Sequence, residues 1–328
     1  MKLVIALSHR VELWNVPAWF PERLRKDFPR LEVENLNSFE HLLERIQGAE
    51  IVIAQTLRPE QITAARKLRW IHCPSAAVHQ LMFPELINSD IIVTNGSEVH
   101  GPVVAEHVMA LIFALAKNLH RAVRFQQQKV WGQMAMWTDQ PRPRELAGAT
   151  LGLIGLGAIG SRVAKHAAAL GMRVIAVREH PGKPKPDFIT QVFGPADLDG
   201  MIAQSDYVVL TTPITPATRG LMNAARLAKM KPGACVINVG RGPLVDEPAL
   251  AAALREKKIG GAALDVFEKE PLPEDSPLWE LENLLITPHT GGLSEKLWER
   301  QYELMSENLR RYFAHLELVG MVDKQGGY

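Results

Sequence analysis

Short, fully apolar runs alternate with segments of helical pattern along the second half of the chain, and this alternation restricts the possible folds more than any other feature. Six of the runs are expected to be strands: Thr150–Ile154, Arg173–Val177, Tyr207–Leu210, Cys235–Val239, Ala262–Leu264 and Leu284–Ile286. Strands that are apolar on both faces are typical of parallel sheets covered by helices on both sides. The pattern therefore predicts an α/β, doubly wound parallel sheet.

The first half of the chain shows the same alternation, and at ~150 residues per domain the 328 residues amount to about two domains. A long helical pattern runs from Gly101 to about Gln128, and a closing one runs from about Ser294 to Leu316. The apolar stretch Val103–Ala116 is shorter than the ~20 residues that span a bilayer, so we expect a buried helix there. The expected strands are Leu3–Leu7, Ile51–Ala54, Trp70–His72 and Ile91–Thr94, with helical segments such as Pro59–Leu68 and Val78–Ile87 between them.

Charge and cysteine content narrow the class of protein. The 37 Lys and Arg residues balance 36 Asp and Glu residues, so the net charge of +1 provides no general attraction to nucleic acid or to anionic membranes. Only two cysteines are present, Cys73 and Cys235, which argues against a disulfide framework and for a cytoplasmic location. The sequence has no paired His/Cys spacing, and we therefore expect no metal site.

A glycine-rich string follows the first strand of the second half. Residues 155–160 read G-x-G-x-x-G and lie between the apolar strand and an alanine-rich helical segment, Ser161–Leu170. In this context the first glycine permits a tight turn, the second lets a pyrophosphate approach the backbone, and the third lets helix and strand pack closely. The helix N-terminus then presents free N–H groups to the phosphates. We expect a dinucleotide to be bound by Gly155, Leu156, Gly157, Ala158, Ile159 and Gly160.

The residue after the next strand bears on the choice of cofactor. An NAD-binding chain is expected to carry Asp or Glu here to accept hydrogen bonds from the ribose, whereas this chain has Arg178. An arginine suits a 2′-phosphate, and His180, Lys183 and Lys185 follow it. The sequence therefore favours NADP over NAD, although Glu179 stands beside Arg178 and leaves NAD open.

Four further polar strings each follow an expected strand, at the carboxyl edge where open parallel sheets bind ligands. Three residues in them suit one reaction: Arg241 can bind a carboxylate and polarise a ketone, His289 can donate a proton, and Glu270 can favour the imidazolium and orient it. Singly, each residue is more typical of a braced loop or a solvated surface, but together they indicate a catalytic site. These strings, with the last residue of one preceding strand, supply further candidate cofactor contacts: Pro213, Val239, Gly240, Gly291 and Gly292.

The order and spacing of these motifs resemble the D-isomer-specific 2-hydroxyacid dehydrogenases. The resemblance extends from about residue 50 to 320 and is carried by Val104–His107, the glycine turn, Asn238–Gly242, Ala263–Pro271 and Ile286–His289. It implies that Arg241, Glu270 and His289 form a catalytic trio, that Asp265 and Thr212 help to hold the cofactor, and that backbone N–H groups at Ala76 and Ala77 bind the substrate carboxylate. The family often has glycine at position 77 and aspartate at position 79, where this chain has Ala77 and His79, so the substrate anchor departs from the pattern.

The resemblance also implies an architecture. Residues 1–98 and 293–328 are expected to form a flavodoxin-like substrate domain, residues 99–292 a Rossmann-type NAD(P)-binding domain, and the cleft between them the substrate site. The implied activity is reduction of a small 2-oxo acid. A homodimer through the cofactor domain is implied too, and the apolar face of Val103–Leu119 fits either that interface or an internal core. Trp131 and Trp137 are expected to be buried, with a place in a neighbouring subunit's pocket as the alternative.

Other functions remain to be weighed. A dinucleotide-sensing regulatory binding protein could use the same fold and keep the same three residues. Formate dehydrogenases of this fold carry glutamine where Glu270 stands, which argues against that activity. Many phosphoglycerate dehydrogenases add a C-terminal regulatory domain after the closing helix. The sequence given stops soon after that helix, so we do not expect amino-acid feedback through such a domain here.

Overall fold

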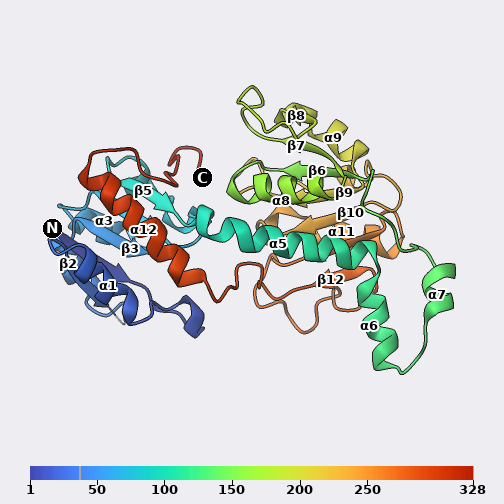
Figure 1. Ribbon diagram of the computed structural model, residues 1–328, viewed down its shortest axis with the longest axis horizontal. Helices are drawn as coiled ribbons and strands as arrows, with labels where there is room; N and C mark the ends of the chain where they lie inside the picture. The colour runs from blue at the N-terminus through green and yellow to red at the C-terminus, as the bar shows by residue number, and fades with distance from the viewer. Residues whose placement is uncertain (37, 328) are drawn as a thin grey trace. The chain divides into compact units, whose positions relative to one another are not determined.

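The computed structural model describes residues 1–36 and 38–327, and its internal contacts divide the chain into two compact units (Figure 1). Unit 1 comprises Met1–His100 and Leu293–Tyr328, and unit 2 comprises Gly101–Gly292. Each unit is built around its own parallel sheet with helices on both faces, which confirms the predicted α/β fold with two parallel-sheet domains.

Unit 1 contains a five-stranded parallel sheet in the order β2-β1-β3-β4-β5. One face packs against α1 and α12, and the other packs against α2, α3 and α4. The strands are β1 (Lys2–Ala6), β2 (Glu32–Leu36), β3 (Ile51–Ala54), β4 (Trp70–Cys73) and β5 (Ile92–Asn95). The helices are α1 (Trp19–Asp27), α2 (Leu42–Arg45), α3 (Pro59–Ala64), α4 (Pro84–Ile87) and α12 (Leu297–Phe313), with 3₁₀ turns at Glu12–Trp14, Ile46–Gly48 and His79–Leu81.

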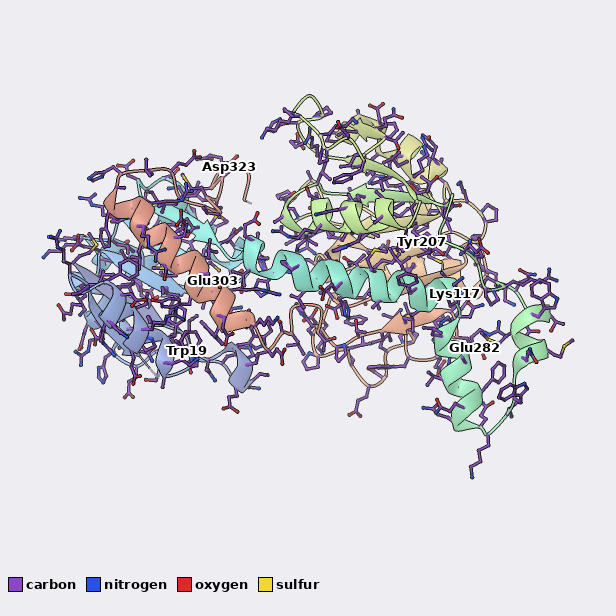
Figure 2. The ribbon with its side chains drawn as sticks, in the orientation of Figure 1. Trp19, Lys117, Tyr207, Glu282, Glu303 and Asp323 are labelled. Carbon is purple, nitrogen blue, oxygen red and sulfur yellow. The ribbon has the colours of Figure 1, made fainter. Side chains whose placement is uncertain are left out.

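Aromatic side chains join the first and last helices of unit 1. Phe20 of α1 is buried and meets Tyr302 and Trp298 of α12 edge-on, with ring centroids 5.6 and 5.5 Å apart. Trp19, labelled in Figure 2, lies 6.0 Å from the same Tyr302 ring. Such edge-to-face pairs stabilise by about 0.5–1.5 kcal/mol beyond the apolar area they bury. They explain why the C-terminal helix belongs to the same unit as the N-terminal strands.

Unit 2 contains a seven-stranded parallel sheet in the order β12-β11-β10-β9-β6-β7-β8. The chain moves outward from β6 in one direction to β7 and β8, then returns to β9 on the other side of β6. Ligands bind at such a switch point, outside the carboxyl ends of the strands. The strands are β6 (Thr150–Ile154), β7 (Arg173–Val177), β8 (Gln191–Phe193), β9 (Tyr207–Leu210), β10 (Cys235–Asn238), β11 (Gly261–Leu264) and β12 (Leu284–Ile286).

Two apolar cores lie on opposite faces of this sheet. One is formed with α5 (Ser97–Ala116) and α8 (Ala158–Ala169) and includes Tyr207, labelled in Figure 2. The other is formed with α9 (Leu198–Gln204), α10 (Ala224–Leu227) and α11 (Glu247–Arg255). The remaining helical elements of the unit are α6 (Leu119–Gln127), α7 (Gln133–Thr138) and 3₁₀ turns at Pro195–Asp197 and Gly242–Leu244.

Helix α5 is the one helix among the described residues that is long and apolar enough to cross a bilayer. Of its most apolar window, 61% is buried inside the protein, as expected for a core helix. Eight apolar side chains between Val104 and Ala116 lie in the core of unit 2, so most of the apolar face that fitted either core or a dimer interface is core. The sequence prediction of a buried helix is confirmed.

Several predicted elements differ in extent. The long pattern to Gln128 is two helices, because Asn118 adopts a left-handed conformation (φ 53°) between α5 and α6. Segment Val78–Ile87 is a 3₁₀ turn followed by α4, since Phe83 before Pro84 is extended. Strands β2 and β8 were not predicted. Strand β2 lies at the edge of its sheet and carries polar side chains, of which Glu34 forms an ion pair with Lys2 at 2.7 Å. It therefore lacks the apolar pattern by which the central strands are recognised in the sequence.

Candidate active site

The glycine turn lies at the carboxyl end of β6, at the switch point of the sheet. Gly155 has φ 100°, a conformation that favours glycine, and its N–H donates to the carbonyl of Val177 at 3.0 Å. A Cβ added at Gly160 would lie 2.2 Å from the carbonyl oxygen of Gly155, so helix α8 can approach the turn only with glycine there. A Cβ at Gly157 would meet nothing within 4 Å, which leaves open space at the N-terminus of α8.

The loop after β9 braces this turn. The Thr211 hydroxyl donates to the carbonyl of Gly155 at 2.9 Å. Gly155 also lies close to the backbone of Thr212, and Gly240 lies close to the carbonyl of Thr212. The structure therefore brings together the predicted cofactor residues that follow β6, β9 and β10. Thr211 was not singled out in the sequence, because its role depends on β9 being the neighbour of β6.

Arg178 follows β7, as predicted, and its guanidinium folds over the next loop. It donates to the carbonyl oxygens of Pro184 at 3.2 Å and Pro181 at 3.4 Å, and to that of Lys183. These carbonyl partners are neutral, so the contacts orient the guanidinium without cancelling its charge. Glu179 is exposed beside it.

Arg241 follows β10 in a turn that a buried amide organises. The Asn238 side chain donates to the carbonyl of Arg241 at 2.8 Å and accepts from the N–H of Gly240 at 3.1 Å. Asn238 is completely buried, so the turn has one arrangement. Sequence reasoning treated Asn238 only as part of a motif and missed this role.

His289 and Glu270 form a direct pair although they follow different strands. Nδ1 of His289 lies 2.6 Å from Oε2 of Glu270, and the other carboxylate oxygen accepts from the N–H of Phe267 at 3.0 Å. The carboxylate is an acceptor, so Nδ1 carries the proton in this pair and Nε2 is the nitrogen available for proton exchange. The side chains of His289 and Glu270 are 49% and 36% exposed, so a ligand can reach them.

The charge state of the pair follows from its surroundings. Burial raises the pKa of the Glu270 carboxyl, but hydrogen bonds from His289 and the Phe267 N–H outweigh it, together with the positive charges of His289 and Arg241. The net pKa of Glu270 lies below its usual value, so the group is an anion at neutral pH. An anionic carboxylate at this distance stabilises a protonated imidazole.

Asp265 holds the loop that carries His289. The buried carboxylate accepts from the Thr287 hydroxyl at 2.6 Å, from the N–H of Thr290 at 2.8 Å and from the N–H of Gly291 at 2.9 Å. Burial raises the pKa of Asp265, but hydrogen bonds from His107, Thr287, Gly291 and Thr290 lower it below its usual value. Asp265 therefore accepts hydrogen bonds from residues on both sides of His289, whose φ is 53°. This positioning role was not predicted, and the predicted cofactor contact of Asp265 stays a prediction.

The predicted substrate turn lies in unit 1, at the carboxyl end of β4. The carbonyl of Ala76 accepts from the side chains of Asn95 (3.1 Å) and Ser97 (3.3 Å), and that of Ala77 accepts from Gln80 (3.3 Å). Within residues 1–36 and 38–327, nothing accepts a hydrogen bond from the N–H of Ala76 or Ala77. The turn is thus held by its carbonyl groups while both N–H groups stay available.

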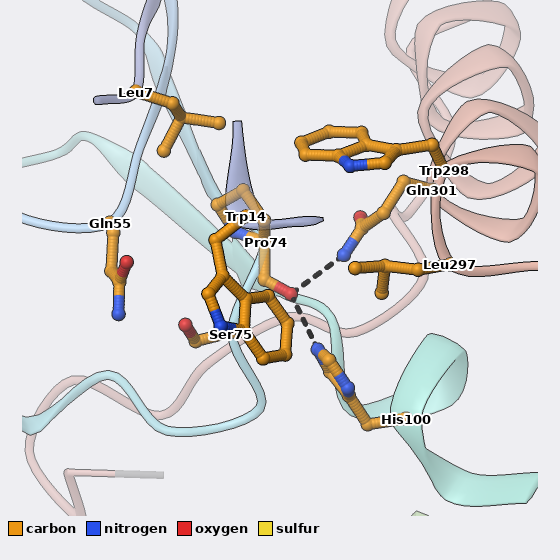
Figure 3. Close-up of a pocket in the computed structure, with 9 residues that line it drawn as sticks. All are labelled: Leu7, Trp14, Gln55, Pro74, Ser75, His100, Leu297, Trp298 and Gln301. Atoms are coloured by element: carbon orange, nitrogen blue, oxygen red, sulfur yellow. Dashed lines mark hydrogen bonds between the residues drawn. The ribbon is translucent and has the colours of Figure 1, made fainter. Parts of the chain in front are cut away.

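A small cavity of about 20 Å³ adjoins this turn, enough for about one water molecule (Figure 3). The carbonyl of Pro74 projects into the group of lining side chains and accepts from Gln301 at 2.7 Å and from Nε2 of His100 at 3.1 Å (Figure 3). The cavity is lined by Leu7, Trp14, Gln55, Pro74, Ser75, His100, Leu297, Trp298 and Gln301. These contacts keep the residues just before Ala76 in place.

The expectation that Trp131 and Trp137 are buried is wrong. Trp131 is 90% exposed and Trp137 is 60% exposed. They belong to α7 and the loop before it, which with α6 extend from the sheet of unit 2 in Figure 1. Every residue of α6 and α7 is exposed or half-exposed, because these helices lack a partner layer within unit 2.

Metal ligation finds no support in the described part of the chain, where no group of three or more His, Cys, Asp or Glu side chains could hold an ion. Neither Cys73 nor Cys235 forms a disulfide, and both side chains are buried. Burial raises the pKa of Cys235 to about 11, which makes it a poor nucleophile at neutral pH.

Comparison with known proteins identifies relatives of the chain. A family model described as "D-isomer specific 2-hydroxyacid dehydrogenase, NAD binding domain" matches residues 109–291. A glyoxylate reductase of Korarchaeum cryptofilum is 32% identical over 272 residues, which cover 82% of this chain and 81% of that protein. A D-3-phosphoglycerate dehydrogenase of Methanocaldococcus jannaschii is 33% identical over 88% of this chain, and the chain spans 54% of its length.

A solved structure is similar over the whole chain. It is a D-isomer specific 2-hydroxyacid dehydrogenase from Xanthobacter autotrophicus Py2, in complex with NADPH and MES. Its TM-score is 0.84 at 31% sequence identity, over 100% of this chain and 99% of that one.

Proposed function

Because this chain belongs to the D-isomer specific 2-hydroxyacid dehydrogenase family, with an NAD(P)-binding domain, we propose that it reduces a small 2-oxo acid to the D-2-hydroxy acid and catalyses the reverse oxidation. The observation that carries the proposal is the 2.6 Å pair of His289 and Glu270, at the carboxyl edge of a sheet whose glycine turn is open at Gly157. That open space at a helix N-terminus fits a dinucleotide phosphate.

Arg241, Glu270 and His289 each have a different role in the proposed reaction. When bound, the nicotinamide cofactor supplies or accepts the hydride. Arg241 binds the substrate carboxylate and polarises the carbonyl to be reduced. His289 donates a proton from Nε2 to the developing alkoxide, while Glu270 accepts from Nδ1–H, keeps the ring oriented and stabilises the imidazolium before transfer. In the oxidation direction the neutral imidazole removes the same proton.

The N–H groups of Ala76 and Ala77 in unit 1 are proposed to bind the substrate carboxylate. Their availability supports this assignment, since an anion is well bound by adjacent backbone donors. Alanine at position 77 restricts the backbone more than glycine does, so the turn is expected to be rigid before substrate arrives.

NADP is proposed as the preferred cofactor. Arg178 supports it, because its guanidinium is oriented by carbonyl groups and keeps its positive charge beside the strand where an NAD enzyme places a carboxylate. The NADPH in the Xanthobacter relative is consistent with this preference. Exposed Glu179 is the competing residue, and NAD is the alternative.

A homodimer in the cytoplasm is proposed as the working form. Helices α6 and α7 with the loop between them expose a set of apolar side chains, which a second copy of the chain would cover: Leu119, Val123, Val130, Trp131, Met134 and Trp137. The buried cysteines Cys73 and Cys235, which form no disulfide, are compatible with a reducing compartment.

Turnover with a graded panel of 2-oxo acids tests the function, with NADPH and NADH each supplied in turn. The His289→Ala variant is expected to lose ~10²–10⁴-fold in turnover while cofactor binding, followed by nicotinamide fluorescence, stays intact. Cofactor binding without turnover of any oxo acid would instead favour a dinucleotide-sensing regulatory protein. Turnover of the His289→Ala variant at the wild-type rate would refute the assigned acid.

A further inference from the structure

Two successive backbone N–H groups in the loop after β11 each bind a different carboxylate. The N–H of Phe267 donates to Glu270 at 3.0 Å, and the N–H of Glu268 donates to Oε1 of Glu247 at 2.6 Å. Glu247 is the first residue of α11 and lies 21 positions earlier in the chain. A side chain outside the proposed trio thus holds the peptide next to the one that holds Glu270.

The same peptide rests against the turn that carries Arg241. A Cβ added at Gly242 would lie 1.9 Å from the carbonyl carbon of Phe267 and 2.3 Å from the nitrogen of Glu268. Gly242 therefore lets the Phe267–Glu268 peptide pack directly on the Arg241 turn. With Gly242 beneath this peptide and Glu247 on its N–H, the loop has little freedom to move relative to Arg241.

The carboxylate of Glu247 is affected by the carboxylates of Glu268 and Glu270. Burial and these two carboxylates raise the pKa of Glu247, the hydrogen bond from the Glu268 N–H lowers it, and the net pKa lies above its usual value. Glu268 itself faces Arg219, 3.4 Å from its guanidinium, while the neighbouring Asp246 caps α11 by accepting from Ala249. A half-buried carboxylate beside two others is unfavourable, and the hydrogen bond from the Glu268 N–H offsets part of this cost.

We propose that Glu247 is a positioning residue for the reaction: by clamping the Phe267–Glu268 peptide over Gly242, it keeps Glu270 in hydrogen-bonding reach of His289. The inference rests on the proposed function, because it gives Glu247 a role only through the His289–Glu270 pair. Glu247 acts through its acceptor oxygen, not through its charge.

Substitutions at Glu247 distinguish a role as hydrogen-bond acceptor from an effect of its charge. Glu247→Ala removes the acceptor, and because misplacing a catalytic group by about 1 Å can cost ~10²-fold, we expect turnover to fall ~10- to 100-fold. The alkaline limb of the reduction pH profile is expected to move to lower pH, with cofactor affinity unchanged. Glu247→Gln keeps an oxygen for the Glu268 N–H and loses the charge, so it is expected to retain most of the turnover and the wild-type limb.

Asp246→Ala is the matched control. It removes the cap of α11 and should lower the melting temperature, yet it leaves the loop after β11 in place, so turnover and pH limb should match the wild type. Should Glu247→Ala fail to fold, Glu247→Asp decides the matter. Its carboxylate is one methylene shorter and cannot reach the Glu268 N–H, so turnover must fall and the limb must move.

The possible outcomes are distinct. The inference would be overturned if Glu247→Ala kept the wild-type turnover and the wild-type alkaline limb of the pH profile. If Glu247→Ala does not fold, the same result in Glu247→Asp would overturn it. Equal limb shifts in Glu247→Gln and Glu247→Ala would also overturn it, because they would reveal a charge effect. His289→Ala is assayed alongside: if it is inactive while Glu247→Ala is fully active, the proposed function stands and only this inference fails. If His289→Ala keeps wild-type turnover, the assigned acid is wrong, and if the wild-type protein turns over no oxo acid, the proposed function itself fails.

Discussion

Replacing Glu270 by glutamine tests the electrostatic core of the proposed mechanism. Glutamine has nearly the same shape but no charge, and it has a single acceptor oxygen, whereas Glu270 accepts from both His289 and the Phe267 N–H. The substitution removes the anion that stabilises the imidazolium, and it leaves one of these two donors facing an amide NH2 group in place of an acceptor oxygen. We expect reduction to be lost at lower pH than in the wild type.

The size of this shift follows from the geometry of the pair. A hydrogen bond to a charged group contributes about 1.5–3 kcal/mol, and a neutral one about 0.5–1.5 kcal/mol. The difference is about 1–1.5 kcal/mol. The two side chains are 49% and 36% exposed, so solvent screens the pair and the lower end, about 1 kcal/mol, applies. Losing this stabilisation disfavours the protonated imidazole, so the alkaline limb should move to lower pH.

The assay is kcat/KM for oxo-acid reduction across the neutral and alkaline range, followed by cofactor absorbance. Oxidation of the hydroxy acid needs the neutral imidazole, so its acidic limb should move down by the same amount. Glu268→Gln is the control, since it removes one exposed carboxylate from the same loop without touching His289. A limb that stays in place in Glu270→Gln, or one that moves equally in Glu268→Gln, would contradict the reasoning.

Three further results are expected. Arg241→Lys keeps the charge but loses the planar fork, so oxo-acid KM should rise and kcat should fall together in steady-state kinetics, and unchanged kcat/KM would show that another group binds the carboxylate. Arg178→Asp should turn a roughly ten- to hundredfold preference for NADPH into one for NADH, and equal use of both cofactors by the wild type would sink the assignment. Burial, opposed by a hydrogen bond that the His72 ring donates to the Gln301 side-chain oxygen, lowers the pKa of His72 from 6.5 to about 4. The unfolded chain then binds a proton before the folded one does, so denaturant unfolding should show stability falling by about 3 kcal/mol as pH drops from 6.5 to about 4, and a His72→Gln variant with the same slope would refute this.

The central strands and the glycine turn could be predicted from the sequence because their determinants are local. A strand buried on both faces is apolar at most positions, so β6, β9 and β10 were identified almost to the residue. The conformation of Gly155 depends only on its lack of a side chain, and the spacing to Gly160 follows from the start of a helix. Each of these features is present in a stretch of fewer than about 20 residues, which pattern reading can recognise.

Exposure of the α6–α7 segment could not be predicted in the same way. Tryptophan is usually buried to a large extent, so Trp131 and Trp137 were expected to pack inward. Whether an apolar side chain is buried depends on which helix or sheet packs against it. A local sequence pattern does not predict that packing. Strand β2 was missed for the related reason that an edge strand needs few apolar residues when ion pairs such as Lys2–Glu34 cover it.

The sequence alone determined the residue types of the proposed site, their order, and the strand that each follows. Only the tertiary structure decided which of them touch. Because β11 lies between β10 and β12, Asp265 reaches the His289 loop and Glu270 reaches His289, across 25 and 19 positions of the chain. The clamp by Glu247 depends likewise on α11 beginning beside the loop that follows β11. Hydrogen bonds between loops depend on strand adjacency, which arises when the whole sheet assembles, so single segments of sequence do not encode them.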